Sequence, residues 1–122
     1  LVLEHGFAYG STGRALEGKI AFNVVTAGAR REVYMPGGSY KYELRDFFVP
    51  FEMTVLLCRM RYLPPFALFA AGHAIDEDRL EPHAAEYERL LRAIAADRLD
   101  LDRAESRARL IDLDNLIVPE VA

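Results

Sequence analysis

The sequence lacks the features that are typical of disulfide-rich folds, metal centres, membrane-spanning segments and nucleic-acid-binding surfaces. Its single cysteine, Cys58, excludes an internal disulfide and a metal site built from several cysteines, and it fits a reducing, intracellular compartment. No apolar run approaches the roughly 20 residues that a membrane span needs. The net charge is −4, and the arginines are dispersed among acidic residues, so we expect no nucleic-acid partner.

What is present suffices for one hydrophobic core. Of the 122 residues, 52% are hydrophobic, slightly more than the roughly 45–50% of an average globular chain. This length allows one domain at most. The chain opens with Leu1-Val2-Leu3, without an initiator methionine or a basic segment, so we expect no signal peptide and a sequence that begins partway into a protein.

The most informative segment is Lys19–Gly28, with the sequence K-I-A-F-N-V-V-T-A-G. The apolar run Lys19–Val25 predicts a strand buried on both faces, as in the parallel sheets of α/β proteins. Ligands of such sheets bind outside the carboxyl ends of the strands. Small residues at Thr26–Gly28 let backbone N–H groups approach a flat or anionic ligand. The segment therefore predicts a cofactor loop, although an ordinary strand-to-loop turn fits the same residues.

Further along the chain, the positions of apolar, proline and acidic residues predict helices and one more strand. Pro50 lies within a helical spacing of apolar residues and predicts either a helix that begins there or a kink near Val49. A strand is predicted at Phe66–Ala70, after two prolines. The acidic residues at Asp76–Asp78 predict the start of a helix. The apolar stripe of that helix is predicted to comprise Leu80, Ala84, Tyr87, Leu91 and Ile94.

Strands that alternate with helices predict an α/β fold with a parallel sheet. Two strands are too few for an independently stable layered domain, so either a partner supplies the remainder or the chain is the latter part of a longer one. We place a domain portion at residues 1–96. Residues 97–122, where acidic, basic and leucine residues alternate, form a predicted C-terminal extension with a helix around Leu101–Ile111.

Several blocks together resemble the flavodoxin-like NAD(P)H:quinone oxidoreductases. The similarity is greatest to the bacterial branch that includes the ancillary oxidoreductases of glutathione-regulated potassium-efflux systems. It runs from residue 1 to about residue 96. The blocks are H-G-F-A-Y-G at His5–Gly10, G-K at Gly18-Lys19, V-T-A-G at Val25–Gly28, P-F-E-M-T at Pro50–Thr54 and L-C-R-M-R-Y-L-P-P-F at Leu57–Phe66.

The resemblance implies the C-terminal part of a flavodoxin-like, three-layer αβα fold, whose N-terminal strands and phosphate-binding loop are missing from this sequence. It implies a flavin, FMN or FAD, that takes a hydride from NAD(P)H and passes two electrons to a quinone. It also implies a homodimer in the cytoplasm. The alternative function is that of a regulatory ancillary subunit, in peripheral contact with a potassium-efflux transporter at the inner face of the membrane. The isolated 122-residue chain is expected to bind flavin weakly or not at all.

The same resemblance assigns residues to the flavin. Thr26, Ala27, Gly28 and Ala29 align with a Thr-Thr-Gly-Gly loop that lies against the flavin ring in the family, and the two alanines depart from that pattern. If position 29 requires a positive φ, alanine would be strained there. Tyr34 aligns with a catalytic tyrosine whose hydroxyl reaches the flavin edge, although a loop aromatic that packs over the core fits equally well.

One further residue and one pair of residues complete the predicted site. Tyr40 falls where some relatives place a histidine with a charge-stabilising role, which a phenol with a pKa near about 10 fills less well at neutral pH. Phe7 and Tyr9 align with the aromatic wall of the quinone pocket, which the neighbouring subunit contributes in relatives. Aromatic anchors beneath a loop are the alternative for this pair.

The remaining histidine, cysteine and arginine residues do not indicate a second kind of functional site. His5, His73 and His83 have no metal-ligand spacing, so we expect no metal site. Cys58 continues an apolar stripe and is expected in the core. Arg30 and Arg31 are candidates for the phosphate of NADPH, although a plain surface role is the simpler expectation.

Overall fold

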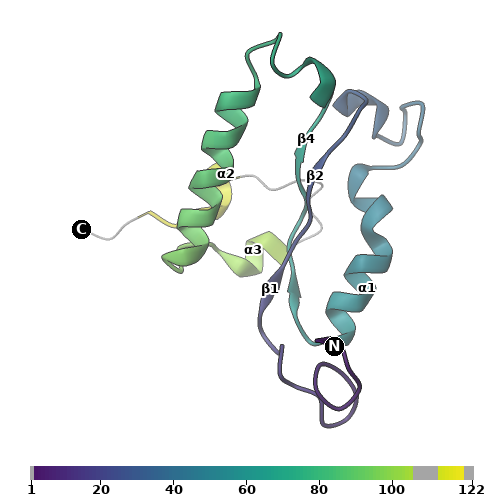
Figure 1. Ribbon diagram of the computed structural model, residues 1–122, viewed down its shortest axis with the longest axis vertical. Coiled ribbons are helices and arrows are strands. Elements are labelled where there is room, and N and C mark those ends of the chain that lie inside the picture. Colours follow the sequence, from purple (N-terminus) through teal and green to yellow (C-terminus); the bar gives the residue numbers. More distant parts are fainter. Residues whose placement is uncertain (1, 106–112, 120–122) are drawn as a thin grey trace.

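The computed structural model describes residues 2–105 and 113–119 (Figure 1). Its centre is a pair of parallel chain segments that contain β1 (Ile20–Ala21), β2 (Val24–Thr26), β3 (Arg61–Tyr62) and β4 (Phe66–Leu68). β1 pairs with β3 and β2 with β4, both parallel. Helix α1 (Val49–Leu57) lies on one side of the strands and α2 (Leu80–Ala95) on the other. The predicted α/β fold with parallel strands is therefore confirmed.

The strand pair is interrupted because one strand has an extra residue. Ile20 faces Arg61 and Val24 faces Phe66, so four steps along the first strand correspond to five along the second. The surplus residue falls at Leu63–Pro65, and neither Pro64 nor Pro65 has an N–H to donate to a ladder.

This interruption corrects two predictions from the sequence. The single strand at Lys19–Val25 is two short strands, and it is not buried on both faces, since Val24 is 47% exposed. Within the described residues β1 and β2 have a strand neighbour on one edge only, and the other edge is open. The strand predicted at Phe66–Ala70 ends at Leu68 because the chain turns at Ala70.

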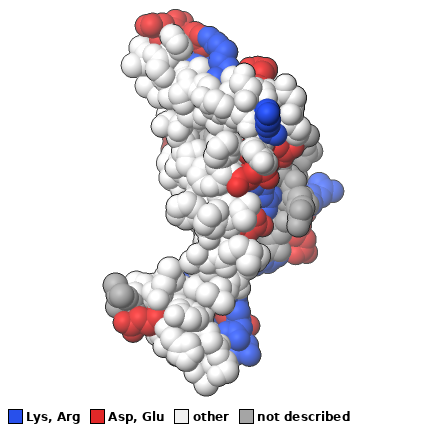
Figure 2. All heavy atoms as spheres, turned by 90° about the vertical axis from the view of Figure 1, so that its right-hand side faces the viewer, with Lys and Arg blue, Asp and Glu red and all other residues white. Residues whose placement is uncertain are grey.

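Helix α1 begins at Val49 with Pro50 in its first turn, which confirms the helix start predicted from that proline. A short 3₁₀ helix, η2 (Leu44–Phe48), leads into it. None of the residues of α1 is buried, and Glu52 is its only charged residue. Figure 2 shows the broad uncharged surface on this side of the molecule. The α1 face, as we call it, consists of the exposed residues Val49, Phe51, Met53, Leu56 and Leu57.

Helix α2 forms as predicted, but its buried face differs from the predicted stripe. The helix begins at Leu80, and Asp76–Asp78 form a turn before it, with Asp78 at a φ of 52°. Leu90 is completely buried, whereas Leu80 and Leu91 are 44% and 45% exposed. Tyr87 and Ile94 of the predicted stripe pack against the core, so the prediction is confirmed at these two positions and wrong at the other three, because the buried face is turned toward Leu90.

The hydrophobic core joins the strands, α2 and the C-terminal residues. It consists of Leu63, Phe66, Leu90, Leu99, Leu113 and Leu116. Helix α4 (Leu113–Leu116) supplies two of these residues, and Leu101 of helix α3 (Leu101–Glu105) packs against the cluster. The helix predicted at Leu101–Ile111 is present through Glu105, and its remainder lies outside the described residues. The boundary at residue 96 stays a prediction.

His83 of α2 makes the stability of the fold depend on pH. Its imidazole stacks on Phe66, with ring centroids 4.6 Å apart. Burial, and secondarily the charge of Arg79, lowers the pKa of His83 below its ordinary value of 6.5. Because the unfolded chain then binds a proton more readily than the folded one, this stability is present above about pH 6.5 and is lost as the pH falls through the lower folded-state pKa.

We therefore expect the free energy of unfolding to decrease between about pH 7 and pH 5 in urea titrations. His83→Gln should flatten that decrease, and His73→Gln, at an exposed histidine, should retain it. The same slope in both variants would contradict this assignment.

Candidate functional site

The loop after β2 has unpaired backbone donors. Pairing continues one residue past the strand, because the N–H of Ala27 donates to the oxygen of Leu68 at 2.8 Å. The N–H groups of Gly28, Ala29 and Arg30 donate no hydrogen bond within the described part of the chain. A side chain at Gly28 would meet open space. The structure thus places three free N–H donors and one small, exposed residue at the carboxyl end of β2.

Ala29 is not strained. It is absent from the described residues with positive φ, so alanine fits the backbone at this position without cost. The departure from a glycine here therefore leaves the shape of the loop intact.

Aromatic rings gather next to this loop. Tyr34, directly after the 3₁₀ helix η1 (Arg31–Val33), makes edge contacts with Tyr40 at 5.2 Å and Phe47 at 5.9 Å between ring centroids. Phe69, directly after β4, lies 5.6 Å from Tyr34. These four rings, the aromatic cluster, come from two segments at the same end of the strands. Tyr34, Tyr40 and Phe47 belong to the connection between β2 and α1, and Phe69 belongs to the segment after β4. The sequence-based site includes both tyrosines and misses both phenylalanines, although Phe69 lies near the carboxyl end of the strand predicted at Phe66–Ala70.

A hollow of about 520 Å³ adjoins this cluster. It is lined by Tyr42, Asp46, Phe47 and Val49. It therefore connects the aromatic cluster with the beginning of the α1 face. A wider hollow of about 850 Å³ lies along α2, lined in part by Glu88, Arg89 and Arg92, well away from the loop after β2.

The N-terminal loop, which contains Phe7 and Tyr9, lies at the opposite end of the strand pair (Figure 1). Their loop is fastened by Arg59, whose guanidinium donates to the oxygens of Gly10 at 3.1 Å and Gly13 at 2.7 Å. Seven residues of strand at about 3.3 Å each separate the two ends by roughly 20 Å. Within one copy of the chain, these two aromatic residues therefore do not meet the loop after β2.

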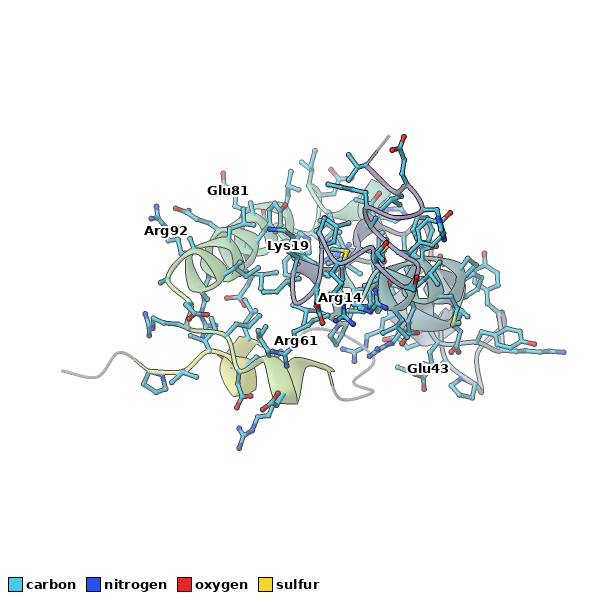
Figure 3. All side chains as sticks on the ribbon, turned by 90° about the horizontal axis from the view of Figure 1, so that it is seen from below. Arg14, Lys19, Glu43, Arg61, Glu81 and Arg92 are labelled. Atoms are coloured by element: carbon cyan, nitrogen blue, oxygen red, sulfur yellow. The ribbon has the colours of Figure 1, made fainter. Side chains whose placement is uncertain are left out.

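The amino end of the strands is a charged, solvated region. Figure 3 looks along the molecule from this end and labels Arg14, Lys19 and Arg61 there. Arg14 pairs with Glu17 at 3.2 Å, and Arg61 with Asp102 of α3 at 2.9 Å. These contacts are exposed ion pairs, which contribute little to stability and indicate no catalytic arrangement.

Arg30, one of the two arginines considered for a cofactor phosphate, already has a carboxylate partner. Its guanidinium donates to Glu77 at 2.6 Å, which raises the pKa of Arg30 above its ordinary value. Arg31 is exposed at the start of η1. A phosphate at Arg30 would therefore compete with the carboxylate bound there.

Other chemistries find no support in the geometry. Within residues 2–105 and 113–119, no three His, Cys, Asp or Glu residues come together to hold a metal ion. Cys58 is 1% exposed, which confirms its predicted place in the core. None of the helices in the described ranges is long and apolar enough to cross a membrane.

Comparison with known proteins identifies the family. The model for proteins of flavodoxin-like fold, Flavodoxin_2, matches residues 1–91. The chain belongs to this family, and its parallel strands between two helical layers are the corresponding architecture.

Curated relatives are about twice as long. General stress protein 14 of Bacillus subtilis is 40% identical over 78 residues, which are 64% of this chain and 45% of the relative. The glutathione-regulated potassium-efflux system ancillary protein KefG of Pectobacterium carotovorum is 37% identical over 86 residues, or 70% of this chain and 46% of the relative. The chain thus spans about half the length of the curated relatives it matches.

Solved structures share the fold. General stress protein 14 of Treponema denticola in complex with FMN has a TM-score of 0.66 and 34% identity, over 75% of this chain and 52% of that one. An NADPH-quinone reductase from P. pentosaceus has a TM-score of 0.59 and 27% identity, over 69% and 49%. A chain described as a tryptophan halogenase from Streptomycin violaceusniger has a TM-score of 0.67 and 39% identity, over 71% and 50%. Since the names of these proteins describe different reactions, the comparisons define the fold of this chain more closely than its chemistry.

Proposed function

We propose that this chain forms the flavin-facing part of an NAD(P)H:quinone oxidoreductase. The observation that carries the proposal is the set of free N–H groups at Gly28, Ala29 and Arg30, beside the aromatic cluster at the carboxyl end of β2. The similarity to a protein crystallised with FMN and to an NADPH-quinone reductase supports it, and the first of these favours FMN over FAD.

The residues present suit a flavin. A bound flavin would accept a hydride from the nicotinamide and donate two electrons to the quinone. The small residues Ala27 and Gly28 allow a flat ring to approach the backbone, and free N–H donors favour the negative charge of the reduced ring. The Thr26 side chain is exposed at the same strand end. The hydroxyls of Tyr34 and Tyr40 are the side-chain donors of the aromatic cluster and would stabilise charge at the ring edge.

The quinone pocket would be shared between two copies. The N-terminal loop that contains Phe7 and Tyr9 lies at the far end of the strands from the loop after β2, and α1 extends between the two ends (Figure 1). Two copies that pack their α1 faces in opposite directions would bring these rings of one copy to the loop of the other. Val49, Phe51 and Met53 would then be buried, which suits apolar side chains that are 46–61% exposed in the single copy. We therefore propose a homodimer with two shared sites.

The test uses the native protein that contains this sequence. It should purify yellow with about one flavin per chain and should oxidise NADPH with menadione as acceptor. The isolated 122-residue chain is expected to bind FMN weakly or not at all. A native protein without flavin, or one that holds flavin without reducing menadione, would contradict the proposed reaction.

An ancillary role at a potassium-efflux transporter is the second candidate, and the similarity to KefG favours it. In that case flavin would be structural or sensory, and the α1 face would contact the transporter or the membrane-side partner. Co-purification of a transporter with the native protein, together with negligible menadione reduction, would support this role over the first.

A further inference from the structure

The loop that bears the free N–H groups is bonded to the segment after β4. The Ala27 N–H donates to Leu68, the Ala71 N–H to the oxygen of Ala27 at 3.1 Å, and the Ala70 N–H to the oxygen of Ala29 at 2.9 Å. The position of residues 27–30 therefore depends on the backbone of residues 68–71.

That segment has an unfavourable backbone conformation. Ala70 is left-handed, with φ 46° and ψ 50°, a conformation that is unfavourable for any residue other than glycine. Arg79 offsets this by donating from Nη1 to the oxygen of Phe69 at 2.8 Å and from Nη2 to the oxygen of Ala70 at 2.9 Å. The planar guanidinium thereby fixes both carbonyls of the turn.

Glu77 connects this turn to the loop. It accepts from Nε of Arg79 at 2.6 Å and from Nη2 of Arg30 at 2.6 Å. The hydrogen bonds from Arg30 and then Arg79 lower the pKa of Glu77 to about 2, so the carboxylate is ionised at neutral pH. Arg30, Glu77 and Arg79, the clamp, thus form one continuous chain of charge-assisted hydrogen bonds from the loop to the turn.

We propose that Glu77 and Arg79 are positioning residues, which hold the N–H groups of residues 28–30 in place through Arg30. Exposed ion pairs contribute little one at a time. Here the series of hydrogen bonds is anchored at both ends, at the loop through Arg30 and at two backbone carbonyls through Arg79. Breaking the hydrogen bonds of Glu77 in the middle of the series therefore releases the loop. The part of this inference that concerns flavin rests on the proposed function.

The test compares Glu77→Gln with Glu81→Gln in the native protein. Glu81 is exposed, lies four residues along the chain and projects from α2 away from the strands (Figure 3). Hydrogen exchange at the N–H groups of Ala27, Ala70 and Ala71 should be roughly 5-fold faster in Glu77→Gln and unchanged in Glu81→Gln. Arg30→Gln should have the same effect, and combining it with Glu77→Gln should add nothing.

The flavin provides a readout that a purely structural role would not alter. Misplaced N–H donors stabilise the reduced, anionic ring less well, so the midpoint potential of bound FMN should become more negative in Glu77→Gln and stay unchanged in Glu81→Gln. Unchanged exchange in Glu77→Gln would overturn the clamp. Faster exchange with an unchanged potential would overturn its positioning role. If the native protein binds no flavin, the proposed function fails, while the exchange experiment still decides whether the clamp exists.

Discussion

Leu90→Ala is expected to lower the free energy of unfolding by about 2–5 kcal/mol. Leu90 is completely buried on α2 and contacts the central hydrophobic cluster that includes Leu63, Phe66 and Leu116. Removing its side chain loses the transfer free energy and leaves a cavity between α2 and the strands. Since a domain is stable by only about 5–15 kcal/mol, this loss should be plain in urea denaturation of the native protein.

The adjacent residue provides the control. Leu91 is 45% exposed, so Leu91→Ala removes the same atoms with little loss of packing. Leu90→Met, which keeps the volume, should cost less than about 1.5 kcal/mol and guards against outright misfolding of the alanine variant. Equal losses in Leu90→Ala and Leu91→Ala would show that the buried face of α2 is assigned wrongly.

Gly28→Val is expected to weaken FMN binding by roughly 10- to 100-fold without lowering thermal stability. A side chain at Gly28 meets no protein atom within 4 Å, so the folded chain has room for it. The same open space is where a flavin ring would approach the free N–H groups, and a branched side chain there would block the approach.

The matched control is Gly37→Val in the following loop. Gly37 also has open space in front of it, so valine should be accommodated there, and FMN affinity should be unchanged. Fluorescence titration of the native protein with FMN, after removal of bound flavin, measures both. An unaltered affinity in Gly28→Val would remove the loop after β2 from the flavin site.

Where a pattern is local, the sequence predicted the structure well. The alternation of strands with helices predicted the parallel α/β fold, and Pro50 predicted the start of α1, because a proline at the first turn of a helix loses no hydrogen bond. The run that ends in Thr26–Gly28 predicted a loop at the carboxyl end of a strand. Each of these elements is recognised from neighbours within a few residues.

Long-range contacts decided the features that the sequence left open or obscured. The bulge at Leu63–Pro65 depends on how two strands pair, and the rotation of α2 depends on how Leu90 fits against them. The clamp joins Arg30 to a residue 47 positions away, which no local spacing indicates.

Residue order alone thus determined the class of fold and the location of a loop with small residues. Only the tertiary structure decided that Tyr34 and Tyr40 meet in one aromatic cluster, while the loop that contains Phe7 and Tyr9 is held by Arg59 at the other end of the strands. The physical reason is that periodicity reports which side of an element is apolar, whereas the pairing of distant segments sets where each loop ends up.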